Sequence, residues 1–518
     1  MSLTRVKYWE IIADNLSKAG WSWGCVSAFA KNFEPQTTKV NAVLLFSAAD
    51  GPNLCDSLGM KATFNGRTIK WLGAILGVSL LAALATFGST SIGSLTFTNT
   101  PLLRPDGNSE PEISIAANGT MAMVGLSLGL APDMQFGTNL WTGPFGATPT
   151  FQGIIDGALQ QPGRTEFGGE DADVDFGSTG TLHATTLIFL GNPTLVTGQL
   201  GVSAITCGNA ASGFNSNNCA AQIIDTTQTD RPWITSDGSR VWISYHDSGN
   251  SSLIHIQRSD DDGLTFHRVG DPIVGQGGAT GNATFNNDQG PIVADSFTHN
   301  IYDIYAAGEA GIQKGTTANF NNIFVSRSTD GGVTWTATLV FHAPLNVAQN
   351  NVFPTLAVDP ANGRLHAAWS DAHTVFYSTS SDQGMTWSPA VAVNIARAKT
   401  ALFPWIATRN GIVDLVYYGT TAASKDDPSA VWKVYLAQTT DDGLHFTQSL
   451  VSNKRNHVGV ICTDGIACPQ PQIPGTRNLL DLFKVAIDPQ NGKAAVIYTD
   501  DASLGAPSLP QVVLAQQN

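Results

Sequence analysis

Residues 259–266 read SDDDGLTF and place three consecutive carboxylates ahead of a glycine. Several carboxylates in one short loop suggest a calcium site, which needs oxygen ligands at fixed alternate positions. The stretch returns three times, as STDGGVTW at 328–335, SSDQGMTW at 380–387 and TTDDGLHF at 439–446. Asp260 and Asp262 have no counterpart in most copies, so the ligand set is not repeated with the pattern. The sequence therefore favours a structural turn over a metal site.

Four features recur in every copy: a Ser or Thr, an Asp two positions later, a Gly two further on, and a closing aromatic residue. The Asp carboxylate can accept hydrogen bonds from the backbone of its own turn, and the Gly can adopt the positive φ of a hairpin corner. This pattern resembles the Asp-box, or BNR repeat, of the sialidase-like β-propeller family. The resemblance implies that each box joins the third and fourth strands of a blade at the periphery, away from an active site. The shared aspartates are Asp261, Asp330, Asp382 and Asp441.

A second repeat consists of an apolar strand, a turn and another apolar strand. Its clearest copies begin at residues 230, 352, 402 and 482, and weaker ones begin at 110, 171 and 288. Each copy is expected to supply the first two strands of a four-stranded antiparallel blade, because a repeated unit buries its exposed face against the next. Seven copies predict an all-β, seven-bladed propeller over residues 90–518, with the six blades of sialidases as the alternative. Residues 93–99 are expected to close the last blade beside the C-terminal strand.

The composition agrees with many short strands, because charged residues make up only 13% of the chain and glycine occurs 52 times. The formal net charge of −14 excludes nucleic acid as an expected partner, since phosphate binding needs a cationic surface.

The segment 60–86 has the layout of a signal peptide. Lys61, Arg67 and Lys70 precede an apolar run from Trp71 to Ala85, which ends in the cleavable triplet Ala-Leu-Ala. A retained signal anchor is the alternative, and the membrane is expected as a partner only through this segment. Residues 1–59 show none of the repeats and are predicted to be an extension outside the mature protein. We therefore expect a secreted or cell-envelope protein.

Cysteine spacing supports export. Cys207 with Cys219, and Cys462 with Cys468, form two close pairs after the signal segment. Close pairs of this kind are expected to form disulfides in an oxidising compartment. Cys25 and Cys55 precede the segment.

Candidate binding residues lie on the loops that lead into the first strand of a blade. An arginine fork suits bidentate capture of a carboxylate such as that of sialic acid. The resemblance implies three such arginines, and we assign Arg231, Arg397 and Arg477.

The resemblance also implies a Tyr nucleophile paired with a Glu, and an Asp acid/base. On the loops that join second to third strands, the matching residues are Tyr418, Glu309, and Asp247 or Asp371. The Phe/Tyr-Arg-Ile-Pro motif of the family is absent. His246 and His373 stand beside the two aspartates, but the pairs are too dispersed to predict a metal site. No metal and no cofactor is expected.

Two functions remain open. One is an exo-glycosidase that removes terminal sialic acid or a related sugar. The other is a non-catalytic propeller that binds a glycan, another small anionic ligand or a protein at the cell envelope. The fold alone does not choose between them. A monomer is expected in both cases.

Overall fold

The computed structural model describes residues 89–128, 137–159, 169, 171–189, 200–247, 253–273, 287–308, 320–345, 347–471, 473, 475–504 and 509–518. The predicted signal segment and extension lie outside these residues. The described residues belong to one compact unit, Ala82–Asn518. Within them, no helix has the length and apolar character needed to cross a bilayer.

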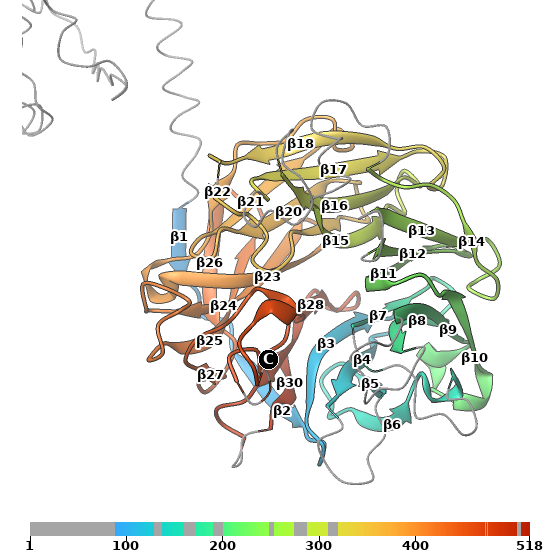
Figure 1. Cartoon of the computed structure of the whole chain (residues 1–518), viewed down its shortest axis with the longest axis horizontal. Coiled ribbons are helices and arrows are strands. Elements are labelled where there is room, and N and C mark those ends of the chain that lie inside the picture. Colours follow the sequence, from blue (N-terminus) through green and yellow to red (C-terminus); the bar gives the residue numbers. More distant parts are fainter. Residues whose placement is uncertain are drawn as a thin grey trace, which may run out of the picture. The chain divides into compact units, whose positions relative to one another are not determined.

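Seven sheets are arranged around a ring, with their first strands nearest the centre (Figure 1). This confirms the prediction of an all-β propeller with seven antiparallel blades. Blades 1 to 3 contain β3 (Asn108–Ile115), β4 (Thr120–Ser127), β5 (Thr138–Pro144) and β6 (Thr150–Ile154); β7 (Ala172–Phe176), β8 (Leu182–Phe189), β9 (Leu200–Cys207) and β10 (Cys219–Asp225); and β11 (Thr229–Asp237), β12 (Arg240–Asp247), β13 (Ile254–Ser259) and β14 (His267–Arg268). Blades 4 and 5 contain β15 (Asn287–Ala294), β16 (Ile301–Ala307), β17 (Asn322–Ser328) and β18 (Thr336–His342); and β19 (Thr355–Val358), β20 (Leu365–Ser370), β21 (Val375–Ser380) and β22 (Val391–Ala392).

Blades 6 and 7 depart from this plan. Blade 6 contains β23 (Thr400–Arg409), β24 (Ile412–Thr420), β25 (Val431–Thr439) and β26 (His445–Leu450), extended by β1 (Ser89–Ile92) and β27 (His457–Val458). Blade 7 takes β28 (Lys484–Ile487), β29 (Ala494–Asp500) and β30 (Gln511–Gln517) from the C-terminal end and β2 (Phe97–Leu102) from far upstream.

The ring is closed by pairing between β2 and β30, as expected from the sequence. Their antiparallel register runs from Phe97 opposite Gln517 to Leu102 opposite Val512. The Tyr498 hydroxyl donates a hydrogen bond of 2.7 Å to Asn99 Oδ1 and so ties β2 to blade 7 a second time. Strands from distant parts of the chain therefore share one blade.

The second strand of each blade forms most of the core. Every residue of β16 and of β29 is buried, and β4 is buried except at its first residue. Neighbouring blades cover both faces of a blade, so these strands read as continuous apolar runs instead of alternating ones.

The four repeated turns join the third and fourth strands of blades 3 to 6. In the first, Asp261 Oδ1 accepts hydrogen bonds from the Ser259 hydroxyl and the Thr265 N–H, at 2.7 and 2.8 Å. These and the Thr265 hydroxyl lower the pKa of Asp261 to about 2. Gly263 has φ +82°. The carboxylate is thus used inside its own turn, and the described residues contain no cluster of three or more His, Cys, Asp or Glu that could hold a metal.

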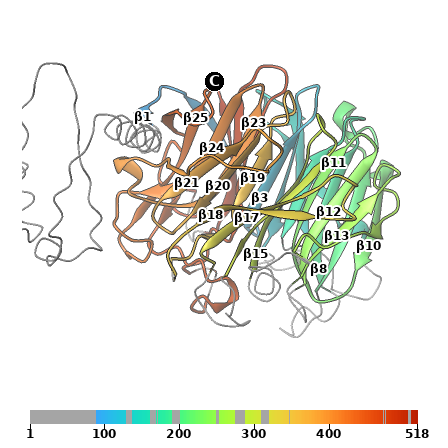
Figure 2. The same cartoon turned by 90° about the horizontal axis from the view of Figure 1, so that it is seen from above.

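The strands run from one face of the ring to the other (Figure 2). First strands begin at one face, which we call the mouth face, so the loops between second and third strands lie there as well. The repeated turns and the hairpins between first and second strands lie at the opposite face, which we call the turn face.

Candidate active site at the mouth of the ring

Backbone bulges mark the point where the chain passes the mouth. In blades 1, 3, 4 and 6, two consecutive residues of the first strand have no paired residue on the second strand, which marks a β-bulge. In three of them a non-glycine residue with positive φ precedes a proline: Glu110 at 48°, Arg231 at 51° and Phe403 at 55°. Leu480, just before β28, has φ 53°. Such conformations cost roughly 1 to 3 kcal/mol each and cluster at functional sites, so we take the mouth as the candidate site.

Two arginine–carboxylate pairs stand at the mouth. Arg231 Nη1 donates to Asp288 Oδ1, and Asn350 Nδ2 donates to the other oxygen of Asp288 at 2.7 Å. Arg477 Nη2 donates to Asp481 Oδ2. Each guanidinium therefore already has a carboxylate partner, and Arg231 also lies 3.6 Å from Asp230.

Further carboxyl groups surround these pairs. Glu110 Oε1 accepts a hydrogen bond of 3.0 Å from the Asp481 N–H. Asp171, just before β7, is influenced by Glu110, Asp230 and Asp481, and its pKa is raised well above its usual value by burial and then by these neighbouring charges. Asp171 thus favours its protonated form more than an isolated aspartate does.

Aromatic rings form the other wall of the mouth. A hollow of about 200 Å³ is lined by Phe353, Phe403, Pro404, Trp405, Asp481 and Phe483. The Arg231 guanidinium lies over the Phe353 ring, 4.8 Å from its centroid. Asp481 Oδ1 is buried and has no hydrogen-bond partner among the described residues. Asp481 is thus the one charged residue among those that line the hollow.

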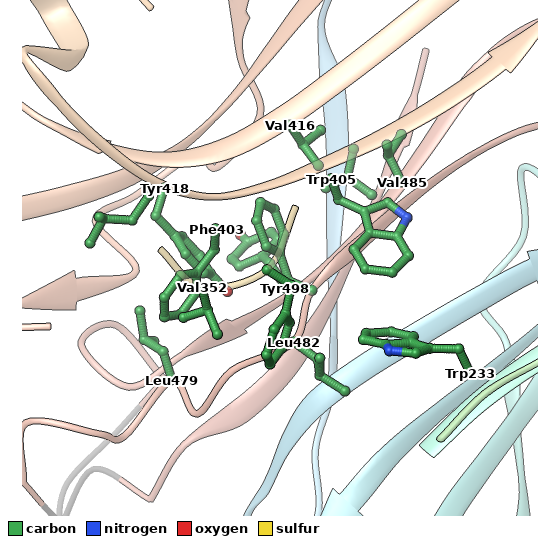
Figure 3. Close-up of a cluster of buried hydrophobic side chains, with 14 of the residues drawn as sticks. Trp233, Val352, Phe403, Trp405, Val416, Tyr418, Leu479, Leu482, Val485 and Tyr498 are labelled. Carbon is green, nitrogen blue, oxygen red and sulfur yellow. The ribbon is translucent and has the colours of Figure 1, made fainter. Parts of the chain in front are cut away.

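The channel beneath the mouth is filled by side chains. Trp233 of blade 3 stands two residues after Arg231, and Trp405 of blade 6 stands two residues after Phe403. The two tryptophan rings pack with their centroids 5.2 Å apart (Figure 3). Lys484 of blade 7 reaches Glu112 Oε2 at 2.8 Å and Asp173 Oδ1 at 2.6 Å, and lies over the Trp405 ring. This plug joins blades 1, 2, 3, 6 and 7, so the mouth opens into a blind hollow.

A disulfide-closed loop helps to form the rim. Both predicted disulfides are present, Cys207–Cys219 between β9 and β10, and Cys462–Cys468 around η5 (Gly465–Ala467). Beside Cys462, the Thr463 hydroxyl donates to Asn351 Oδ1 of blade 5 at 3.3 Å. The loop that leads into blade 7 is thereby tied to another blade.

Of the three predicted arginines, two come together. Arg231 and Arg477 share Asp171 and Asp481 as charged neighbours. Arg397 lies on η4 (Ala396–Ala398), is exposed, and accepts a hydrogen bond from the Tyr435 hydroxyl at its carbonyl. The structure therefore groups two of the three.

The other predicted catalytic residues are scattered. Tyr418 is 0% exposed, stacks on Phe483 with centroids 4.4 Å apart, and accepts a hydrogen bond from the Thr499 N–H (Figure 3). Burial raises its pKa, which favours a structural hydroxyl over a nucleophile. Asp247 lies 3.5 Å from His255 Nε2, and Asp371 accepts two backbone hydrogen bonds in the turn after β20. Glu309 lies outside the described residues.

Comparison with protein-family models finds no match, and comparison with curated protein sequences finds none at a significant level. Solved structures give similarities at low identity. An α-L-arabinanase from Penicillium chrysogenum in complex with arabinobiose is 11% identical over 82% of this chain and 97% of that chain, with a TM-score of 0.39. The Trypanosoma rangeli sialidase is 12% identical over 82% and 58%, at 0.37. The α-L-arabinofuranosidase Arb93A from Fusarium graminearum is 11% identical over 66% and 98%, at 0.42.

The prediction of a sialidase-like β-propeller is confirmed for the fold, which the seven blades of the structure show. TM-scores this low carry no argument. The site therefore has to be judged on its own residues.

Sequence reasoning missed the carboxyl groups of the mouth. The repeat itself carried a signal, because four of its copies open with an acidic residue, as in EPE, DAD, DRP and DQGP. Those openings point to Glu110, Asp171, Asp230 and Asp288, whereas the predicted catalytic residues were assigned to loops between second and third strands.

Proposed function

We propose that this propeller is a glycoside hydrolase whose site is the mouth, and that it acts on an uncharged glycan. The observation that carries the proposal is the contrast between two carboxyl groups. Burial and three neighbouring carboxyl groups raise the pKa of Asp171, and Asp481 is paired with Arg477 and lines the hollow. Glycoside hydrolysis needs one protonated and one ionised carboxyl group on either side of the scissile bond.

In this proposal Asp171 donates its proton to the leaving oxygen. Asp481 acts from the other side, either by attacking the anomeric carbon or by taking a proton from the attacking water. The aromatic wall contacts the apolar face of the sugar ring and excludes water, which strengthens the electrostatic interactions within the site.

The charge balance of the mouth supports an uncharged substrate over sialic acid. Glu110, Asp171, Asp230, Asp288 and Asp481 outnumber Arg231 and Arg477, and both guanidinium groups are engaged by carboxylates. Binding a further carboxylate there would require breaking one of these pairs, because a buried charge left without its partner is costly.

A second function is glycan binding without catalysis. It is supported by Tyr418, the predicted nucleophile, which is fully buried against Phe483. Export to the cell envelope is part of both proposals, and the two disulfides support it.

The test is hydrolysis of a panel of fluorogenic glycosides, including uncharged pyranosides and furanosides and a sialoside, by the full chain. We expect turnover of an uncharged glycoside and a fall in kcat of at least about 100-fold in Asp171→Asn, the range for losing a general acid. Asp442→Asn, an equivalent change at the turn face, should leave kcat unchanged. Glycan binding without turnover of any substrate would move the conclusion to the binding function, and turnover of the sialoside alone would refute the preference for uncharged sugars.

A further inference from the structure

The turn face carries a row of exposed apolar side chains at equivalent positions. The residue after the glycine of each repeated turn is apolar, and its exposed fraction is between 54% and 61% in all four copies: Leu264, Val333, Met385 and Leu444. Phe297, in the hairpin between β15 and β16, is 60% exposed at the same face. A single exposed apolar residue is ordinary. Here an exposed apolar residue recurs at the same position of four consecutive blades, so the four side chains follow the edge of the turn face. We call these four residues the apolar arc.

The turns hold this arc in place. In the second turn the Val333 N–H donates to Asp330 Oδ1 at 3.1 Å, and in the third Asp382 Oδ1 accepts from the Thr386 N–H at 2.9 Å. The backbone on both sides of each apolar side chain is therefore fixed before any partner arrives, which lowers the entropy cost of binding.

Charges of both signs lie beside the arc. Arg258 lies 2.9 Å from Asp260, and Arg364 of blade 5 lies 3.3 Å from Asp442 of blade 6. The aspartates of the turns accept hydrogen bonds within their own turns, as Asp261 does from Ser259 and Thr265. A face with apolar tips and charges of both signs suits a zwitterionic surface better than a strongly cationic or anionic one.

The chain upstream of β1 identifies the partner. β1 pairs in parallel with β26, and Ser89 stands opposite His445, the residue after Leu444. In Figure 2, β1 and the C-terminal end of β30 lie at the same side of the ring, as expected for the turn face. The sequence directly before Ser89 runs uncharged from Trp71 to Gly88, which is 18 residues, within the roughly 17 to 25 needed to span a bilayer.

We propose that this upstream segment is retained as a membrane anchor and that the apolar arc rests on the lipid surface. Even if the anchor ends at Ala85, the four residue-to-residue steps from Ala85 to Ser89 cover at most about 14 Å in a fully extended chain. Blade 6 would then be held at the interface, with Leu444, Met385, Val333 and Leu264 at headgroup level. The mouth would point away from the bilayer.

The test uses the full chain with Cys25→Ser and Cys55→Ser, reconstituted in phosphatidylcholine vesicles. An environment-sensitive fluorophore is attached to Leu264→Cys or Leu444→Cys, at the two ends of the arc. Asp426→Cys, on the β24–β25 loop of the mouth face and 65% exposed at its side chain, is the matched control. We expect a blue shift and at least threefold stronger quenching by a lipid-borne quencher at both ends of the arc than at the control.

Three results would overturn the proposal. One is a mature protein that begins after Ala85. Another is a label at position 264 that behaves like the control, because the arc would then not lie flat on the bilayer. The third is equal protection of both labels without vesicles, which would assign the arc to contacts between protein molecules. Each result is independent of whether the mouth hydrolyses any glycoside.

Discussion

Replacing Glu112 by Gln should make the protein less sensitive to alkaline pH. Glu112 is fully buried in the plug beside Lys484, and burial raises its pKa from 4.5 to about 8. The folded protein therefore keeps a proton that the unfolded chain releases above about pH 4.5. This contribution to stability is fully present below that pH and is lost as pH rises through about 8.

The size of the effect follows from the shift. About 3.5 pH units at roughly 1.4 kcal/mol each give a loss of about 5 kcal/mol between acidic pH and pH 8, as an order of magnitude. Gln resembles the protonated carboxyl group and does not titrate. At about pH 5 the variant should match the parent within about 1 kcal/mol, and at about pH 8 it should be more stable by several kcal/mol.

Urea unfolding midpoints at several values between about pH 5 and pH 8 measure this difference. Other buried acids also lose protons in this window, such as Asp414, whose pKa burial raises to about 7. Only the difference between variant and parent therefore isolates Glu112. Asp442→Asn, an exposed acid, is the control and should follow the parent. Parallel loss of stability in Glu112→Gln and the parent would refute the reasoning, because Glu112 would then not hold its proton in the folded state.

Three further predictions concern the ring and its plug. Trp405→Ala should lower the free energy of unfolding by about 3 to 5 kcal/mol, as expected for a buried aromatic side chain; urea unfolding measures it, and a loss below about 1 kcal/mol would contradict the plug. A chain that starts at Leu103 lacks β2 and leaves β30 as an open edge, so it should melt lower and aggregate more than one that starts at Gly93; equal melting midpoints would show that β2 does not close the ring. Cys462→Ser with Cys468→Ser should cost about 2 kcal/mol through loop entropy, measured against the oxidised parent by thermal unfolding, and an unchanged midpoint would argue against it.

Much of the fold could be predicted from the sequence because its signals are local. Each repeated turn is specified within eight residues, where Asp261 and Gly263 meet the needs of one corner. Seven copies of the two-strand repeat gave the number of blades. The missing strand was expected at 93–99, and the structure places it slightly later, at Phe97–Leu102. The cysteine pairs were close enough in sequence to pair with each other.

The candidate site could not be predicted in the same way. Arg231 and Arg397 were both predicted on loops that lead into first strands, yet Arg231 lies at the bulge within β11 and Arg397 is exposed on η4. Tyr418 ends a second strand that the neighbouring blades cover, so its ring is packed against Phe403 and Phe483. Loop position was thus a poor guide to which side chains meet.

The sequence by itself determined the blade pattern, the turns, the disulfide pairs and the apolar residue at each turn tip, because each depends on a few neighbouring residues. Only the tertiary structure decided that Glu110, Asp171 and Asp481, from three different blades, are charged neighbours at the mouth. Their meeting depends on where the chain enters each first strand and on closure of the ring by β2. The raised pKa of Asp171 follows from that meeting, since burial and neighbouring charge are properties of the folded ring and of no single segment.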